Sequence, residues 1–184
     1  MAVTNVQNIT VVNQLSPEYV RPGVIVNSGS ANSIAAGTPT KMVDAVTSSP
    51  WTGAVQIMVD GDGTTDQRFS GIAYSTSTDT ASTAGTVDII LPYPGLLYAA
   101  KAKTSTTFDT QAEVDANFGK GVFFDLTTGT WSVDVAAAAA QKNCVMIVGG
   151  DYRSQTVYFN YKSSGSVINF SVSAYNTCYK QVYQ

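Results

Sequence analysis

The sequence predicts a mainly β protein: a small antiparallel barrel or sandwich with one short helix, at about residues 111–118, and an extended N-terminal arm. Three observations predict it. Short apolar stretches are separated by loops rich in Gly, Ser, Asn and Asp. Only one segment carries both a helix start signal and a helix stop signal. The first 22 residues follow a different apolar period. We therefore expect an arm over residues 1–22 and a single β-rich domain over residues 23–184.

Strands are expected wherever an apolar stretch ends in a turn signal. The stretch 54–59 ends in Asp60-Gly61-Asp62-Gly63, and residues 86–91 and 95–103 are separated by Pro92-Tyr93-Pro94. Proline cannot sit inside a central strand, so these last two are separate strands. Further strands are expected at 24–26, 43–46 and 68–74, and residues 122–125 and 130–133 are expected to form a hairpin.

The last quarter of the chain alternates cleanly between apolar and polar residues. Val157, Phe159 and Tyr161 share one face of a predicted strand. After Ser163-Ser164-Gly165, residues 168–174 alternate in the same way. The pattern predicts that these two segments form an antiparallel hairpin with one wet face.

One helix is well marked by its ends. Thr110 and Glu113 fit a capping box, and Gly119 with Lys120 fits a C-terminal stop. The helix should place Val114 and Phe118 on one face. The run 136–140 has high helix propensity but is too short to be stable alone, so a short helix and an ordered loop both remain open.

The N-terminal segment has apolar residues at every third position. They are Val3, Val6, Ile9 and Val12. This period fits neither a strand nor an α-helix but suits a polyproline-II-like segment with one apolar edge. We expect these four side chains to contact a partner. The alternative is an irregular first strand in the domain's own sheet.

Charge and composition exclude several function classes. Charged residues make up 12% of the chain, against about 25% in a typical domain, and the net charge is −3. The cations are dispersed, so binding to nucleic acid through its phosphates is not expected. No apolar run is long enough to span a membrane, and the first residues do not resemble a secretory signal. Few charges favour close packing against neighbours, while an unusually neutral soluble domain is the alternative.

The residues also argue against catalysis. There is no histidine, which removes imidazole bases and histidine-ligated metals. Only two glutamates exist, Glu18 and Glu113, and the second is already explained as a capping residue. We therefore expect no enzyme activity, no catalytic residue and no cofactor.

Two smaller features leave alternatives open. Residues Asp60–Asp66 place oxygens at a spacing similar to that of a calcium loop, but a plain turn between strands explains them as well, and we expect no metal. Cys144 lies in an apolar run and is expected to be a core residue; a bridge to Cys178 is possible.

Several segments resemble the decoration, or cement, proteins of tailed-bacteriophage capsids. The segment Phe69-Ser-Gly-Ile-Ala-Tyr74 has the form Phe-x-Gly-Ile-Ala, and residues 84–103 contain an apolar strand that ends in Pro-x-Pro-Gly. Residues 115–134, leading to Ile147–Asp151, are similar to the helix, hairpin and closing loop of that family. The similar segments cover about 100 residues and exclude the first 22 residues and the C-terminal hairpin.

The resemblance implies a virion structural protein that binds the major capsid protein on the capsid exterior after synthesis in the host cytoplasm. A homo-oligomer, most simply a trimer, is expected. One alternative is another virion surface part, such as a head fibre, a tail component or a host-binding adhesin module. A second is a carbohydrate- or calcium-dependent binding domain, which the tyrosine-rich C-terminal region would suit.

Overall fold

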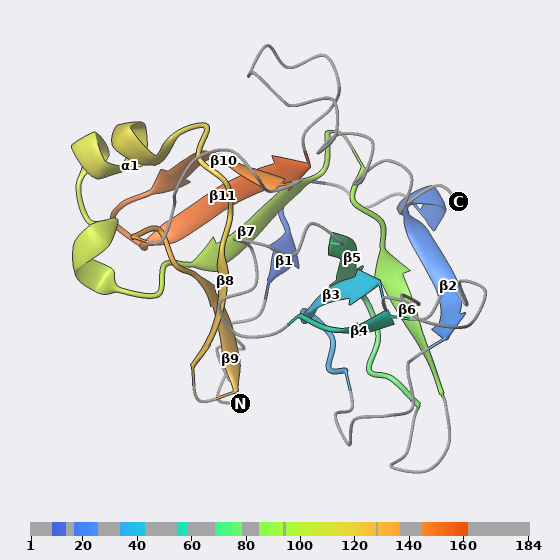
Figure 1. Ribbon diagram of the computed structural model, residues 1–184. Coiled ribbons are helices and arrows are strands. Elements are labelled where there is room, and N and C mark those ends of the chain that lie inside the picture. The colour runs from blue at the N-terminus through green and yellow to red at the C-terminus, as the bar shows by residue number, and fades with distance from the viewer. Residues whose placement is uncertain are drawn as a thin grey trace, which may run out of the picture.

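A computed structural model describes residues 9–13, 17–25, 34–42, 55–58, 69–78, 85–93, 95–127, 129–136 and 145–161 (Figure 1). The strands in these ranges are β1 (Thr10–Val11), β2 (Val20–Ile25), β3 (Pro39–Met42), β4 (Val55–Ile57), β5 (Phe69–Ala73), β6 (Thr86–Ile90), β7 (Leu97–Lys101), β8 (Phe124–Thr127), β9 (Thr130–Val133), β10 (Val145–Asp151) and β11 (Thr156–Tyr161). The helices are α1 (Gln111–Asn117) and two 3-10 turns, Pro17–Tyr19 and Ser105–Thr107. The prediction of a mainly β, antiparallel fold with one short helix is confirmed.

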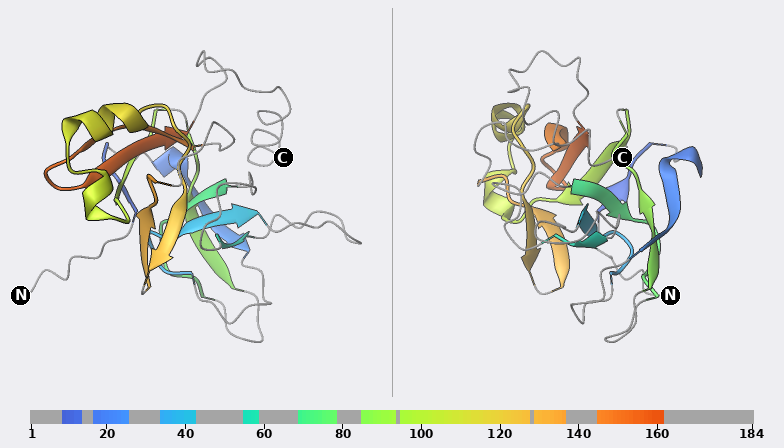
Figure 2. Two further views of the ribbon diagram at one scale, coloured as in Figure 1. Left: turned by 60° about the vertical axis from the view of Figure 1, so that its left-hand side comes forward. Right: turned by 45° about the vertical axis from the view of Figure 1, so that its right-hand side comes forward.

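The strands form two larger sheets and a separate hairpin. The four-stranded sheet has the order β1-β7-β11-β10, the five-stranded sheet has the order β2-β6-β5-β3-β4, and β8 pairs with β9. Figure 2 shows the two sheets and the hairpin from two further sides. Strands β6 and β7 follow each other in sequence but belong to different sheets. The proline-containing turn between them is therefore the point where the chain passes from one sheet to the other.

Both sheets and the hairpin share one apolar core. Phe124, on β8, joins its parts: its ring stacks on that of Phe69 at 5.7 Å between centroids and meets the ring of Phe159 edge-on at 5.8 Å. Phe159 in turn stacks on Tyr98 at 5.6 Å. These four rings come from β8, β5, β11 and β7, so the hairpin packs between the two sheets. Each such pair contributes about 0.5–1.5 kcal/mol beyond the area that it buries.

The five-stranded sheet is apolar on both faces. Ile72 and Ile90 pack into the shared core, whereas Val87 and Ile89 belong to a second, smaller cluster that also contains Ile34, Val55 and Ala73. All five residues of β5 are buried. A strand buried on both faces explains why Phe69–Ala73 shows no alternation of polar and apolar residues.

Helix α1 begins and ends as its capping signals predict. The Thr110 side chain accepts a hydrogen bond from the Glu113 backbone N–H, and the Glu113 carboxylate accepts one from the Thr110 backbone N–H. Val114 is buried, but Phe118 is 62% exposed, so the prediction that they share one face is wrong. The reason is that Phe118 has ψ 132° and has left the helix.

Strand β11 pairs with β10 on one edge and with β7 on the other. The second strand of the predicted C-terminal hairpin, residues 168–174, lies outside the described residues. The alternation itself is confirmed on the inner face, where Val157, Phe159 and Tyr161 are buried. The other face is half-buried rather than wet at Tyr158 and Asn160.

The described residues of the N-terminal segment, 9–13 and 17–25, lie along the domain's own sheets. Ile9 is 3% exposed and belongs to the shared core, and β1 pairs with β7. Strand β2 pairs with β6 and crosses the predicted boundary between residues 22 and 23. Of the residues expected to form an arm, Ile9 is buried in this chain's own core, and residues 20–25 form one of its edge strands. Strands at a sheet edge pair backbone hydrogen-bonding groups that a free arm would leave to water.

Several predictions lie outside the described residues. They concern Val3, Val6, the strand at 43–46, the Asp60–Asp66 loop, most of the run 136–140, both cysteines and residues 168–174.

Candidate functional site

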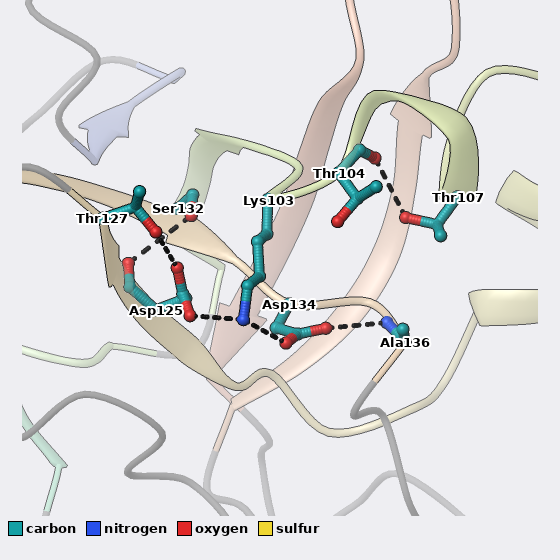
Figure 3. A network of polar contacts seen from close by, with 8 residues as sticks. All are labelled: Lys103, Thr104, Thr107, Asp125, Thr127, Ser132, Asp134 and Ala136. Atoms are coloured by element: carbon teal, nitrogen blue, oxygen red, sulfur yellow. Dashed lines mark hydrogen bonds and ion pairs between the residues drawn. The ribbon is translucent and has the colours of Figure 1, made fainter.

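A lysine and two aspartates form a network where β7 ends beside the β8–β9 hairpin (Figure 3). Lys103 follows β7, and its backbone N–H donates to the carbonyl of Val133 at 2.8 Å. Asp125 lies on β8, and Asp134 directly follows β9. The Asp134 backbone N–H donates to the Phe123 carbonyl at 2.9 Å. Main-chain hydrogen bonds thus bring three charged side chains together from three segments.

The ammonium group of Lys103 lies between both carboxylates. Its Nζ is 2.6 Å from Oδ1 of Asp125 and 3.0 Å from Oδ2 of Asp134. The Asp125 side chain is 8% exposed, and its second oxygen accepts a hydrogen bond from the Thr127 hydroxyl at 2.6 Å. Hydrogen bonds to Asp125 and then Asp134 raise the pKa of Lys103 above its usual range. The ion pairs favour the protonated amine, and the network is suited to fastening the hairpin to β7.

The carboxylates next to helix α1 are used in capping. Glu113 Oε2 accepts hydrogen bonds from the backbone N–H of Asp109 at 2.9 Å and from the Thr110 hydroxyl at 3.0 Å. The bond from the Asp109 backbone is the main reason that the pKa of Glu113 is lowered. The neighbouring Glu113 carboxylate raises the pKa of Asp109. Among the residues that the structure describes, no group of three or more acidic or cysteine side chains could hold a metal ion.

The surface of the described residues exposes five large apolar side chains. They are Val12 (50% exposed), Tyr74 (55%), Tyr93 (44%), Phe118 (62%) and Leu126 (38%). Single exposed apolar residues are normal on a folded domain, so a site requires several of them together. Val12 and Tyr93 lie on neighbouring segments, because the Val12 backbone hydrogen-bonds to Leu97, four residues after Tyr93 in the chain.

Val12 and Asn13 are fixed against the start of β7. The Val12 backbone N–H donates to the Leu97 carbonyl at 2.7 Å. The next residue, Asn13, makes two hydrogen bonds through its side chain. Its Oδ1 accepts a hydrogen bond from the Leu97 N–H at 2.9 Å, and its Nδ2 donates one to the Gly95 carbonyl at 2.8 Å. These bonds hold the N-terminal segment to the turn that follows Tyr93.

Tyr93 is held by a second contact from the N-terminal segment. Its ring stacks on the ring of Tyr19, with 4.6 Å between centroids and 28° between planes. The Leu91 N–H donates to the Tyr19 carbonyl at 2.8 Å, which fixes the two chain segments side by side. We call Val12, Asn13, Tyr19, Tyr93 and Gly95 the junction surface. It combines an ordered aromatic pair, an exposed aliphatic side chain and an amide, and none of its residues carries a formal charge.

The predicted interface residues lie in different environments in the structure. Val12 lies on the junction surface and Ile9 lies in the core, while Val3 and Val6 are outside the described residues. Sequence reasoning missed Tyr19 and Tyr93 as members of one surface. The available signal was a tyrosine between two prolines, which keep the residue in a turn and out of a strand.

Comparison with protein-family models and with curated proteins found no match. Within the described ranges, no helix is both long enough and apolar enough to cross a membrane.

Proposed function

We propose that the chain is a virion structural protein that binds the outside of a tailed-phage capsid lattice and stabilises it. The main support for the proposal is the turn around Tyr93, in the segment 84–103 that resembles decoration proteins. This turn presents Tyr93 at 44% exposure, with its ring stacked on that of Tyr19. Tyr93 and Gly95 of the junction surface belong to the segment that resembles decoration proteins, whereas Val12, Asn13 and Tyr19 lie outside it.

The chemistry of the junction surface favours a protein partner. Aromatic residues are enriched in protein interfaces, whereas charged residues are depleted from the interface core. Stacking on Tyr19 holds Tyr93 in one place, so little side-chain freedom is lost when it docks. A chain with 12% charged residues also has few charged groups to desolvate.

Stabilisation of a capsid would follow from differential binding. A protein that binds the assembled lattice, and not its dissociated subunits, shifts the equilibrium toward the intact shell. This proposal takes the major capsid protein as the partner and a homo-oligomer, most simply a trimer, as the bound form. Each added copy would then contribute the same contact, and the contributions would add over the lattice.

The test begins with mass spectrometry and imaging of purified virions whose genome encodes this chain. We expect the chain at high copy number on the capsid exterior. Purified protein is then added to capsids that lack it, and binding is measured by co-sedimentation and by the melting temperature of the capsid. Its presence only in the tail or in fibres would contradict the proposal.

The junction surface is tested with a matched pair of variants. Tyr93→Ser should weaken capsid binding by about tenfold or more, as loss of an aromatic hot spot of roughly 1.4–2 kcal/mol predicts. Tyr74→Ser is the control, because Tyr74 is 55% exposed but lies after β5, outside the junction surface. Both variants should keep the unbound melting temperature within a few degrees of the native chain's, since each truncates an exposed ring. Equal binding by the two variants would show that another surface docks.

A further inference from the structure

Phe118 is the most exposed large apolar side chain among the described residues. It lies directly after α1 and is 62% exposed. Its backbone is fixed on both sides: the Phe118 N–H donates to the Asp115 carbonyl at 3.3 Å, and the Gly119 N–H donates to the Ile147 carbonyl of β10 at 2.8 Å. An aromatic ring on a fixed backbone loses little freedom when it docks. Neither the capping of α1 nor the junction surface uses this ring.

The turn between β10 and β11 lies at the same end of the molecule as α1. Figures 1 and 2 show the turn beside the helix from three sides. The chain just before the helix also packs on the end of β10, because an added Cβ at Gly150 would lie 2.3 Å from Cε1 of Phe108. The exposed side chains of the turn and of α1 therefore belong to one end of the domain.

The turn presents a positioned guanidinium group. Arg153 is exposed, its guanidinium carbon lies 5.6 Å from the ring centroid of Tyr152, and its Nε donates to the Tyr152 hydroxyl at 3.3 Å. Tyr152 packs against the shared core. Asp151 fixes the backbone, since its Oδ1 accepts a hydrogen bond from the Arg153 N–H at 3.0 Å. Between described residues, the ion pairs involve Lys103 and not Arg153, so the guanidinium fork can take a carboxylate of another molecule.

The outer face of α1 offers such a carboxylate. Asp115 is exposed, whereas Val114 and Asn117 on the same helix are buried. The Asp115 Oδ1 accepts a hydrogen bond from the Gln111 amide at 2.9 Å, which holds the side chain in place and leaves its other oxygen for a further donor. We call Asp115, Phe118, Tyr152 and Arg153 the end surface. It combines a carboxylate, an exposed aromatic ring and a guanidinium.

We propose that the end surface joins copies of this chain, with Asp115 of one copy bound to Arg153 of the next and Phe118 buried at the contact. The occupant follows from charge complementarity, because the surface itself supplies both members of the ion pair and a second copy supplies them again. The contact is therefore repeated in every copy, as in closed symmetric oligomers. It rests on the proposed function only in giving the homo-oligomer a physical basis. It is tested without capsids, so its failure and the failure of capsid binding are distinguishable.

The first test measures self-association of the full chain by sedimentation velocity over a concentration series. We expect a small oligomer that dissociates on dilution and also when salt is added, because salt screens the ion pair. Phe118→Ser should raise the dissociation constant by about tenfold or more. Tyr74→Ser is the matched control, because Tyr74 is 55% exposed but lies outside the end surface. A native chain that is monomeric at every concentration and salt, or equal association by the two variants, would overturn the proposal.

Reversing the ion pair tests the contact itself. Arg153→Glu and Asp115→Arg should each abolish association at low salt, because each brings like charges together. The chain that carries both changes should recover at least part of the association, since the pair is restored in reverse order. Arg21→Glu makes the same change of charge on β2 and should leave association unaltered. All four chains should melt within a few degrees of the native chain, and Arg153→Gln replaces Arg153→Glu if that chain does not fold. A folded double variant that stays monomeric would refute the pairing of Asp115 with Arg153.

Discussion

Replacing Gly71 with alanine should destabilise the protein more than any substitution at its exposed glycines. Gly71 lies on β5 with φ +140°, a conformation that residues with a side chain rarely adopt. An added Cβ would lie 2.2 Å from the carbonyl oxygen of Ile90 and 2.6 Å from Cγ2 of Ile89. The carbonyl belongs to the backbone of the neighbouring strand β6, so it cannot move without disturbing the β5–β6 pairing.

The expected cost combines two effects. A residue with a side chain at such a φ costs about 1–3 kcal/mol. Overpacking a well-filled core costs a further 1–3 kcal/mol, roughly. Their sum of about 2–6 kcal/mol is a large part of the 5–15 kcal/mol that typically stabilises a domain. The same clash explains why the Phe-x-Gly-Ile-Ala motif has glycine at its third position.

Gly129→Ala is the matched control. Gly129 lies in the β8–β9 turn with φ +78°, and nothing lies within 4 Å of an added Cβ. An alanine at position 129 would therefore have a strained backbone but no steric clash, and the substitution should lower the free energy of unfolding by only about 1 kcal/mol. Urea unfolding of the native chain and the two variants, followed by tryptophan fluorescence, gives both free-energy changes. If Gly71→Ala is no more destabilising than Gly129→Ala, the close approach of β6 to Gly71 is not a feature of the folded protein.

Three further results are expected from the same unfolding assay. Ile9→Ala should cost about 2–5 kcal/mol because it opens a core cavity, whereas Val12→Ala should change the free energy of unfolding by less than about 0.5 kcal/mol. Equally small effects of the two substitutions would show that Ile9 is not a core residue. Lys103→Met should lower the free energy of unfolding because it leaves the buried Asp125 carboxylate without its cation, and Lys103→Arg should restore part of the loss. An unchanged free energy of unfolding would mean that the network does not stabilise the fold. The hydrogen bond from the Ser154 hydroxyl lowers the pKa of Asp151 in the folded chain. The ionised carboxylate therefore stabilises the fold at pH values above its usual pKa near 3.9, and this stabilisation is lost as the pH falls through the lower pKa of the folded state. Asp151→Asn should thus be less stable than the native chain at pH 7 and equal to it in strong acid; a constant difference across pH would rule out this titration.

Features set by local chemistry could be predicted from the sequence. The capping box at Thr110 and Glu113 fixes the start of α1 through bonds between residues three apart. The prolines around Tyr93 end one strand and delay the next. Alternation at 157–161 identified the buried face of β11. In each case the determining contacts lie within a few residues along the chain.

Features that depend on distant contacts could not be predicted. The alternation at 157–161 indicates a strand but carries no information about its neighbours, one of which is β7, far away in the sequence. Lys103 meets its two carboxylates only because β7 ends beside the hairpin, and no local pattern connects these positions. Tyr19 and Tyr93 form a stacked pair although 74 positions separate them in the sequence. The proposed junction surface is therefore a property of the fold and not of a motif.

The N-terminal segment shows how one pattern can be assigned to the wrong geometry. A period of three groups Ile9 with Val12 on a single apolar edge. In a strand, residues two apart share a face, and the structure places Ile9 in the core and Val11 against it while Val12 is half-exposed on the other side. Ile9 and Val12, three positions apart, therefore differ in burial. It follows that Ile9 and Val12 do not form one exposed apolar edge in the folded chain.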